Sequence, residues 1–93
     1  MTKSERLFLA ETAERGCALC RWLGYGVTPA QIHHVRTGTG IGRRASHFET
    51  LPLCPEHHTG ATGIHGMGRR AWERKHGITE LDLFAWDNGN AIK

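Results

Sequence analysis

The stretch Cys54-Pro-Glu-His57-His58 decides the fold, because it places a thiol and an imidazole three residues apart in one short turn. Cys17-Ala-Leu-Cys20 has the same spacing much earlier in the sequence. Zinc takes four such ligands tetrahedrally, and a tight turn can aim each pair at one ion. We therefore predict a closed structural zinc site whose ligands are Cys17, Cys20, Cys54 and His57.

The thiols alone allow a second interpretation, in which Cys17 and Cys20 form a redox dithiol and Cys54 is a buried apolar residue. This interpretation leaves His57 unexplained, and three cysteines are an odd number for a disulfide framework. A chain of 93 residues with 39% hydrophobic residues builds only a thin core, which a structural metal commonly supplements. We expect one domain over residues 1–93, stapled by zinc in a reducing compartment.

A histidine pair, Ile32-His33-His34-Val35, lies between the two metal half-sites. Neighbouring residues of a strand point to opposite faces, so His33 and His34 cannot easily bind one ion together. One of them can hold a metal while the other takes a proton from water, a role that suits an imidazole because its pKa lies near neutrality. His58 and His65 are available to complete such an open site.

Local sequence patterns predict a mixture of helices and two strands. The predicted elements are a helix over 5–15 capped by Ser4 and ended by Gly16, strands over 31–35 and 48–53, a helical turn from Pro55, a helix over 66–76, and a last helix that begins with the capping box Thr79-Glu-Leu-Asp82.

His76 and the tryptophans have structural explanations in this scheme. His76 lies at the end of the predicted helix over 66–76, where a cationic imidazole meets the helix dipole favourably. Trp22, Trp72 and Trp86 are expected in the core, because a thin core needs large side chains.

Positive charge is clustered, although the formal net charge is only +3. Clustered arginines favour contacts with phosphates. For the helical group, a solvated helix face explains the charge better than phosphate binding does. The loop group is Arg36, Arg43 and Arg44, and the helical group is Arg69, Arg70, Arg74 and Lys75.

The order of these residues resembles the HNH (ββα-metal) endonuclease motif: a His-His pair on a strand, a Leu-Cys-x-x-His-His knuckle, and a helix with another histidine. The stretch Leu51–Gly77, LPLCPEHHTGATGIHGMGRRAWERKHG, is especially similar to the phage recombination-enhancement (Ref) nuclease family and its small phage relatives. The resemblance covers about residues 16–77. It implies an α+β fold, namely a small zinc-stapled ββα-metal (HNH) fold with flanking N- and C-terminal helices.

The resemblance also implies a role for each matching residue. His34 would be the general base that activates water, and His33 would join His58 and His65 in holding a divalent cation on the scissile phosphate. The cation would be Mg²⁺ or Mn²⁺, with Zn²⁺ or Ni²⁺ as alternatives that an all-imidazole site binds more tightly. The residues that would contact DNA phosphates are Arg36, Arg43 and Arg44.

One position departs from the HNH motif. The motif's middle Asn orients the catalytic histidine, and no Asn occurs between the histidine pair and Cys54. Glu49 and His47 both lie in roughly this region, and an acceptor at either position would hold the imidazole of His34. Glu49 is equally well explained as an exposed strand residue, and His47 as an additional ligand or a surface residue.

The implied function is hydrolysis of DNA phosphodiester bonds by a metal-dependent endonuclease. A monomer with one active site cuts one strand, so we expect nicking that leaves a 5′ phosphate. We expect a phage-derived protein of DNA recombination or processing, with DNA and a recombinase–DNA filament as partners. No signal peptide or membrane span is evident, which predicts the cytoplasm of a bacterial host. The missing Asn leaves one alternative, a catalytically inactive zinc-bound DNA- or protein-binding module.

Overall fold

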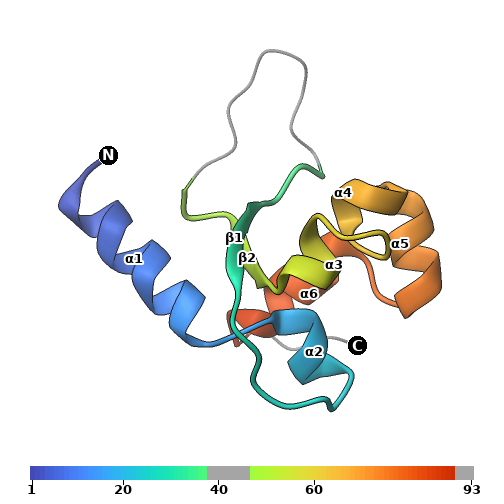
Figure 1. The fold of residues 1–93 in the computed structure, drawn as a ribbon. Helices are drawn as coiled ribbons and strands as arrows, with labels where there is room; N and C mark the ends of the chain where they lie inside the picture. The colour runs from blue at the N-terminus through green and yellow to red at the C-terminus, as the bar shows by residue number, and fades with distance from the viewer. Residues whose placement is uncertain (38–46, 90–93) are drawn as a thin grey trace.

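The computed structural model describes residues 1–37 and 47–89, which form a two-stranded antiparallel sheet with helices around it (Figure 1). The predicted α+β class is confirmed, and no helix within these residues is long and apolar enough to cross a bilayer. The elements are α1 (Lys3–Glu14), α2 (Ala18–Trp22), β1 (Gln31–His34), β2 (Thr50–Leu53), α3 (Pro55–His58), α4 (Ile64–Met67), α5 (Arg69–His76) and α6 (Glu80–Asp87).

The sheet positions the histidine pair. β1 and β2 pair in a register that places His33 opposite Leu51 and His34 opposite Thr50. The side chain of His33 is buried and that of His34 is half-buried, which is the alternation expected along a strand. Both strands are shorter than predicted, although one further bond, from the Val35 N–H to a backbone carbonyl, continues the pairing beyond them. The two histidines therefore serve different sides of the sheet.

The first helix begins earlier than predicted. Thr2, and not Ser4, is the N-cap: its hydroxyl accepts the Glu5 N–H at 3.1 Å, and the Glu5 carboxylate accepts the Thr2 N–H at 2.8 Å. This reciprocal pair is a capping box, which satisfies two backbone donors and leaves Ser4 inside the helix. The chain turns at Gly16, where φ is +83°, and an added Cβ there would lie 2.9 Å from the Thr28 carbonyl oxygen. Glycine is therefore required at this turn before α2.

The predicted helix over 66–76 is two helices. α4 ends at Met67 and α5 begins at Arg69, because Gly68 between them has φ +89° and ψ +148°. A residue in that conformation cannot continue a helix. The predicted end at Gly77 is confirmed, since Gly77 adopts the left-handed conformation of a C-cap.

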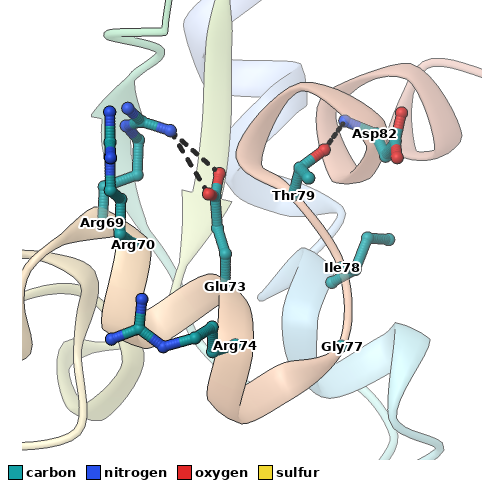
Figure 2. Close-up of a pocket in the computed structure, with 8 residues that line it drawn as sticks. All are labelled: Arg69, Arg70, Glu73, Arg74, Gly77, Ile78, Thr79 and Asp82. Atoms are coloured by element: carbon teal, nitrogen blue, oxygen red, sulfur yellow. Dashed lines mark hydrogen bonds and ion pairs between the residues drawn. The ribbon is translucent and has the colours of Figure 1, made fainter.

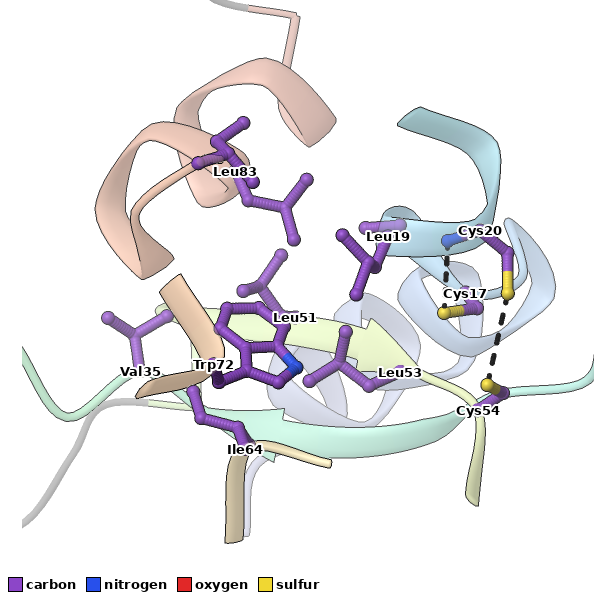
Figure 3. Packing of buried hydrophobic residues seen from close by; sticks show 12 residues of the cluster. Cys17, Leu19, Cys20, Val35, Leu51, Leu53, Cys54, Ile64, Trp72 and Leu83 are labelled. Atoms are coloured by element: carbon purple, nitrogen blue, oxygen red, sulfur yellow. Dashed lines mark hydrogen bonds between the residues drawn. The ribbon is translucent and has the colours of Figure 1, made fainter. Parts of the chain in front are cut away.

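The core lies between β2 and the helices that cover it, and Trp72 is its largest fully buried side chain (Figure 3). Trp86 is partly buried against this core, but Trp22 is 36% exposed, so its predicted place in the core was wrong. The three cysteines belong to the same buried cluster, so the thiols predicted to bind zinc are continuous with the hydrophobic core. The buried apolar residues include Leu19, Val35, Leu51, Leu53, Ile64, Trp72, Ile78 and Leu83.

A buried carboxylate connects three helices beside the cysteines through ion pairs. Asp87, the last residue of α6, forms ion pairs with Arg15 after α1 (2.7 Å) and with Arg21 of α2. The Arg21 guanidinium also lies over the ring of Trp86, 5.6 Å from its centroid. Because a buried carboxylate needs paired partners, these contacts hold the short α2 against α6.

Candidate metal centres

Three thiols and one imidazole converge where α2 and α3 begin. Cys17 is the N-cap of α2 and Cys20 lies within it, while Cys54 is the N-cap of α3 and His57 lies within that helix. All four are buried, and one potential ligand atom from each lies within 4.8 Å of the others. The structure thus brings together the four residues predicted as the closed zinc site.

The spacing of these atoms fits a single tetrahedral ion. Nδ1 of His57 lies 3.7, 3.5 and 3.3 Å from Sγ of Cys17, Cys20 and Cys54, and Sγ of Cys20 lies 3.9 Å from that of Cys54. A zinc tetrahedron with bonds of about 2.3 Å to sulfur and 2.0 Å to nitrogen has edges of roughly 3.5–3.8 Å. The cluster can therefore hold a structural metal such as zinc without rearrangement.

The cluster also carries the electrostatic character of a cation site. Burial raises the pKa of the Cys17 thiol to about 12, because a buried thiolate is unfavourable without a nearby positive charge. The Cys20 N–H points to Sγ of Cys17 at 3.3 Å, a contact that favours the thiolate once a cation is bound.

Three imidazoles form a second cluster on the other side of α3. His33 comes from β1, His58 from α3 and His65 from α4, and one nitrogen of each lies within 4.8 Å of the others. His33 is buried, His58 is half-buried and His65 is exposed, so the cluster opens to solvent on one side. These are the three residues predicted as the open metal site.

The three-histidine cluster favours neutral imidazoles. Burial and the neighbouring His33 and His65 lower the pKa of His58 to about 4. Burial, His33 and Arg36 lower the pKa of His65 in the same way. Neutral imidazole is the form that ligates metals. The cluster therefore suits a bound cation, whereas its three histidines would repel one another if all were protonated.

Glu80 contacts this cluster, and the sequence patterns gave no sign of it. Its fully buried carboxylate places Oε2 2.5 Å from Nε2 of His33, while Oε1 accepts bonds from the Thr37 N–H and hydroxyl and from the Arg36 N–H. Burial alone would raise the pKa of Glu80, but the hydrogen bonds from His33 and Thr37 outweigh it and lower the pKa to about 2. Glu80 is therefore an ionised carboxylate directly behind one of the potential ligands.

A second oxygen acceptor orients another imidazole. Nδ1 of His58 lies 2.9 Å from Oε1 of Gln31, an exposed residue at the start of β1. If this nitrogen donates to Gln31, Nε2 of His58 is left for an ion. Nothing in the spacing of Gln31 could have indicated this contact, because the two residues meet only through the packing of α3 on β1.

On the opposite side of β1, His34 pairs with His47. Nε2 of His34 lies 3.0 Å from Nδ1 of His47, with ring centroids 5.2 Å apart. Burial, together with His47, His33 and Arg36, lowers the pKa of His34. The side chain of Glu49 is exposed, and within the described residues it forms no hydrogen bond or ion pair. Of the two residues considered in place of the motif Asn, His47 is the one that lies next to His34.

Of the three arginines predicted to contact DNA, only Arg36 lies within the described residues. Arg36 is exposed and follows β1, and its charge acts on both His34 and His65. Arg43 and Arg44 lie outside the described residues. Arg36 is therefore an exposed positive charge close enough to act on His65 of the three-histidine cluster.

His76 does not behave as the cationic helix cap that was expected. Its ring packs edge-on against His57 and Trp72, with centroids 5.4 and 5.5 Å away. Burial, followed by the charges of His57 and Lys75, lowers the pKa of His76, which disfavours the charged form. His76 is instead a packing residue behind the cluster of Cys17, Cys20, Cys54 and His57, which we call the Cys17–His57 cluster. Gly77 ends the helix.

The helical arginines line an open pocket on α5 (Figure 2). Arg69 donates to both carboxylate oxygens of Glu73 at 3.2 and 3.4 Å, and Oε2 of Glu73 also accepts the Glu80 N–H at 2.8 Å. Part of the positive charge is thus balanced by a carboxylate that secures the start of α6. The pocket is lined by Arg69, Arg70, Glu73, Arg74, Gly77, Ile78, Thr79 and Asp82.

The described part of this small α+β fold thus carries two dissimilar clusters that could each hold a metal ion, a buried Cys₃His cluster and an open His₃ cluster. The sequence model of the recombination enhancement, RecA-dependent nuclease family matches residues 1–87, and the chain belongs to this family. Its membership confirms the predicted nuclease class and the link to recombination. No curated protein and no solved structure matches the chain significantly.

Proposed function

We propose that this protein is a metal-dependent DNA endonuclease of the HNH type, which nicks DNA at the three-histidine cluster. The observation that carries the proposal is the arrangement around β1. His33 faces two further imidazoles on one side of the strand, and His34 faces His47 on the other. A potential cation site and a potential proton acceptor thus lie at successive residues, and a metal ion and a general base are two groups that can drive phosphodiester hydrolysis.

His33, His58 and His65 would hold one divalent cation. When bound, that cation would polarise the scissile phosphate and stabilise the departing 3′ oxygen. Mg²⁺ or Mn²⁺ is the proposed working ion, with Zn²⁺ or Ni²⁺ as alternatives that imidazoles bind more tightly. The exposed edge at His65 leaves room for a phosphate to approach.

His34 would take the proton from the attacking water. If Nε2–H of His34 donates to Nδ1 of His47, Nδ1 of His34 remains free to accept that proton. The water oxygen then forms the new bond to phosphorus, and the bond to the 3′ oxygen breaks. The departing 3′ oxygen takes a proton from solvent water, so the products are a 5′ phosphate and a 3′ hydroxyl. In this scheme His47 fixes the ring of His34 and takes the place of the motif Asn.

Arg36 supports the assignment of DNA as the substrate. Its guanidinium is exposed, and its charge acts on residues of both sides of the site. A guanidinium in this place can hold a phosphate of the backbone without reading its base. Arg43 and Arg44, which follow Arg36 in the sequence, are proposed to extend this contact.

The test is nicking of supercoiled plasmid with Mg²⁺ or Mn²⁺, with and without a RecA filament on the DNA. Loss of the general base should lower the nicking rate of His34→Ala by about 10²–10⁴-fold. Glu49→Gln is the matched control, and it should cut at the rate of the unchanged protein. The content of zinc per chain shows that each variant is folded. A folded protein that never nicks, with any metal or filament, would be the binding module instead.

A further inference from the structure

Glu80 lies at the first position of α6, where its carboxylate fills the space between that helix and the end of β1. The side chain is completely buried. Four donors surround it: the His33 ring at 2.5 Å, the Arg36 N–H at 3.1 Å, and the Thr37 N–H and hydroxyl at 2.9 and 2.6 Å. A buried carboxylate with this many donors is held in one position.

The hydrogen bond to Glu80 determines which nitrogen of His33 faces the cluster. Oε1 of Glu80 accepts three hydrogen bonds from Arg36 and Thr37, and Oε2 meets the ring of His33, where a carboxylate oxygen accepts from Nε2–H. In the neutral imidazole that ligates a metal, Nδ1 is then unprotonated and is the nitrogen left for an ion. The tautomer and the ring orientation of His33 are therefore both fixed from behind.

Glu80 itself is not placed as a ligand. The set of donor atoms that all lie within 4.8 Å of one another consists of the imidazoles of His33, His58 and His65, without the Glu80 carboxylate. Both carboxylate oxygens are already engaged by His33, Arg36 and Thr37. The side chain touches a ligand but stays outside the ligand set.

The backbone of Glu80 is secured separately. Its N–H donates to Oε2 of Glu73, one turn into the preceding helix, and Glu73 is paired in turn with Arg69 (Figure 2). Thr79 caps α6 through the Asp82 N–H at 3.0 Å, which leaves the Glu80 carboxylate free for the other task. The backbone at the start of α6 is thus held independently of the contacts that the Glu80 side chain makes at the end of β1.

We infer that Glu80 is a positioning residue of the open metal site. It holds His33 as the Nε2–H tautomer with Nδ1 toward the cation, and it clamps the backbone at Arg36 and Thr37 to the same point. Carboxylates that hold metal-ligating histidines in this way typically improve metal affinity by about 10–100-fold. The inference rests on the proposed function, because it assigns His33 a cation, and it adds a residue from outside the motif.

The first measurement needs no variant. In protein labelled with ¹⁵N-histidine and holding one zinc per chain, long-range ¹H–¹⁵N spectra report which nitrogen of His33 is protonated. We expect the Nε2–H tautomer with a bare Nδ1. The opposite tautomer would overturn the inference even if every Glu80 variant failed to fold.

The second measurement is Co²⁺ titration of the same one-zinc protein, followed by visible absorption. Bands without thiolate charge transfer show that Co²⁺ binds imidazoles and leaves the Cys17–His57 cluster intact. Glu80→Gln keeps the shape but loses the charge, and its Kd for Co²⁺ should rise by about 10–100-fold. Thr37→Val is the matched control, since it removes one donor from Oε1 and leaves the His33 contact, and its Kd should stay within about twofold.

The outcomes separate the two proposals. If the unchanged protein binds no Co²⁺ beyond its zinc, the proposed metal site of the nuclease fails. If it binds Co²⁺ and folded Glu80→Gln binds equally well, the metal site stands and the positioning role of Glu80 is refuted. If Thr37→Val weakens binding as much as Glu80→Gln, the effect comes from the anchored turn and not from His33.

Discussion

The two clusters of potential ligands share one helix turn but differ in almost every physical respect. His57 and His58 are neighbours in α3, yet each belongs to a different cluster. Successive helical residues point about 100° apart, so the two rings cannot face one ion. One cluster is buried and rich in thiols, while the other is open and made of imidazoles alone. Burial and donor type thus separate a closed cluster from an open one within two residues.

The largest effect should follow from damage to the buried cluster. Cys54→Ser keeps the size of the side chain but removes a soft ligand. Metal binding at structural zinc sites contributes about 10–16 kcal/mol to folding, which matches or exceeds the whole stability of a small domain. We expect a protein that retains no zinc and has lost its circular dichroism spectrum and thermal transition.

If Cys54→Ser remains folded without zinc, the buried cluster is not a structural metal site and its contrast with the open cluster is lost. That result would make the thiols ordinary core residues, since all three already belong to the buried apolar cluster. Measured zinc content and thermal unfolding on the same sample distinguish the two explanations.

Damage to the open cluster should abolish chemistry and leave the fold. His65 is exposed and donates no hydrogen bond to the core among the described residues, so His65→Ala should keep its zinc content and its Tm within a few degrees. Nicking should fall by more than the 10–100-fold typical of losing an outer partner, because a ligand itself is removed. Plasmid nicking and thermal unfolding measured together check this. A large fall in Tm would show that the open cluster is structural too.

The next smaller effect should come from loss of the contact between His34 and His47. His47→Ala removes the partner of His34 at 3.0 Å without removing the base. Nicking should fall by about 10–100-fold, less than in His34→Ala. Rates from single-turnover plasmid assays measure the ranking, with Glu49→Gln unchanged. Equal rates for His47→Ala and the unchanged protein would leave His34 without an orienting partner on this side.

The parts of this molecule that sequence could predict are those set by short spacings. Cys17 and Cys20 share one turn, as do Cys54 and His57, so each pair points the same way wherever the rest of the chain goes. The alternation of His33 and His34 is equally local, because it follows from strand geometry alone. These local constraints define each half-site, whereas the resemblance to the HNH motif was needed to assign His58 and His65 to the same ion as His33.

The residues that sequence did not reveal act across the fold. Glu80 meets His33 across 47 positions of sequence, and within Thr79-Glu-Leu-Asp82 it resembled part of a helix cap. Only Thr79 and Asp82 form that cap, so the Glu80 carboxylate was available to the strand. The break at Gly68 was missed for a related reason: glycine permits a helix as well as a turn, and tertiary packing decides between them.

The smallest effect should come from the rim of the open cluster. Arg36→Ala removes an exposed guanidinium near His34 and His65, while its backbone N–H still donates to Glu80. DNA binding should weaken evenly across sequences, and the slope of log K against log salt should fall by about 1, as for one lost phosphate contact. Arg6→Ala, on the exposed face of α1, is the control for net charge. Binding measured at several salt concentrations checks both. If the two variants change the slope equally, the charge at Arg36 acts only through the whole protein, and the open cluster has no phosphate contact of its own there.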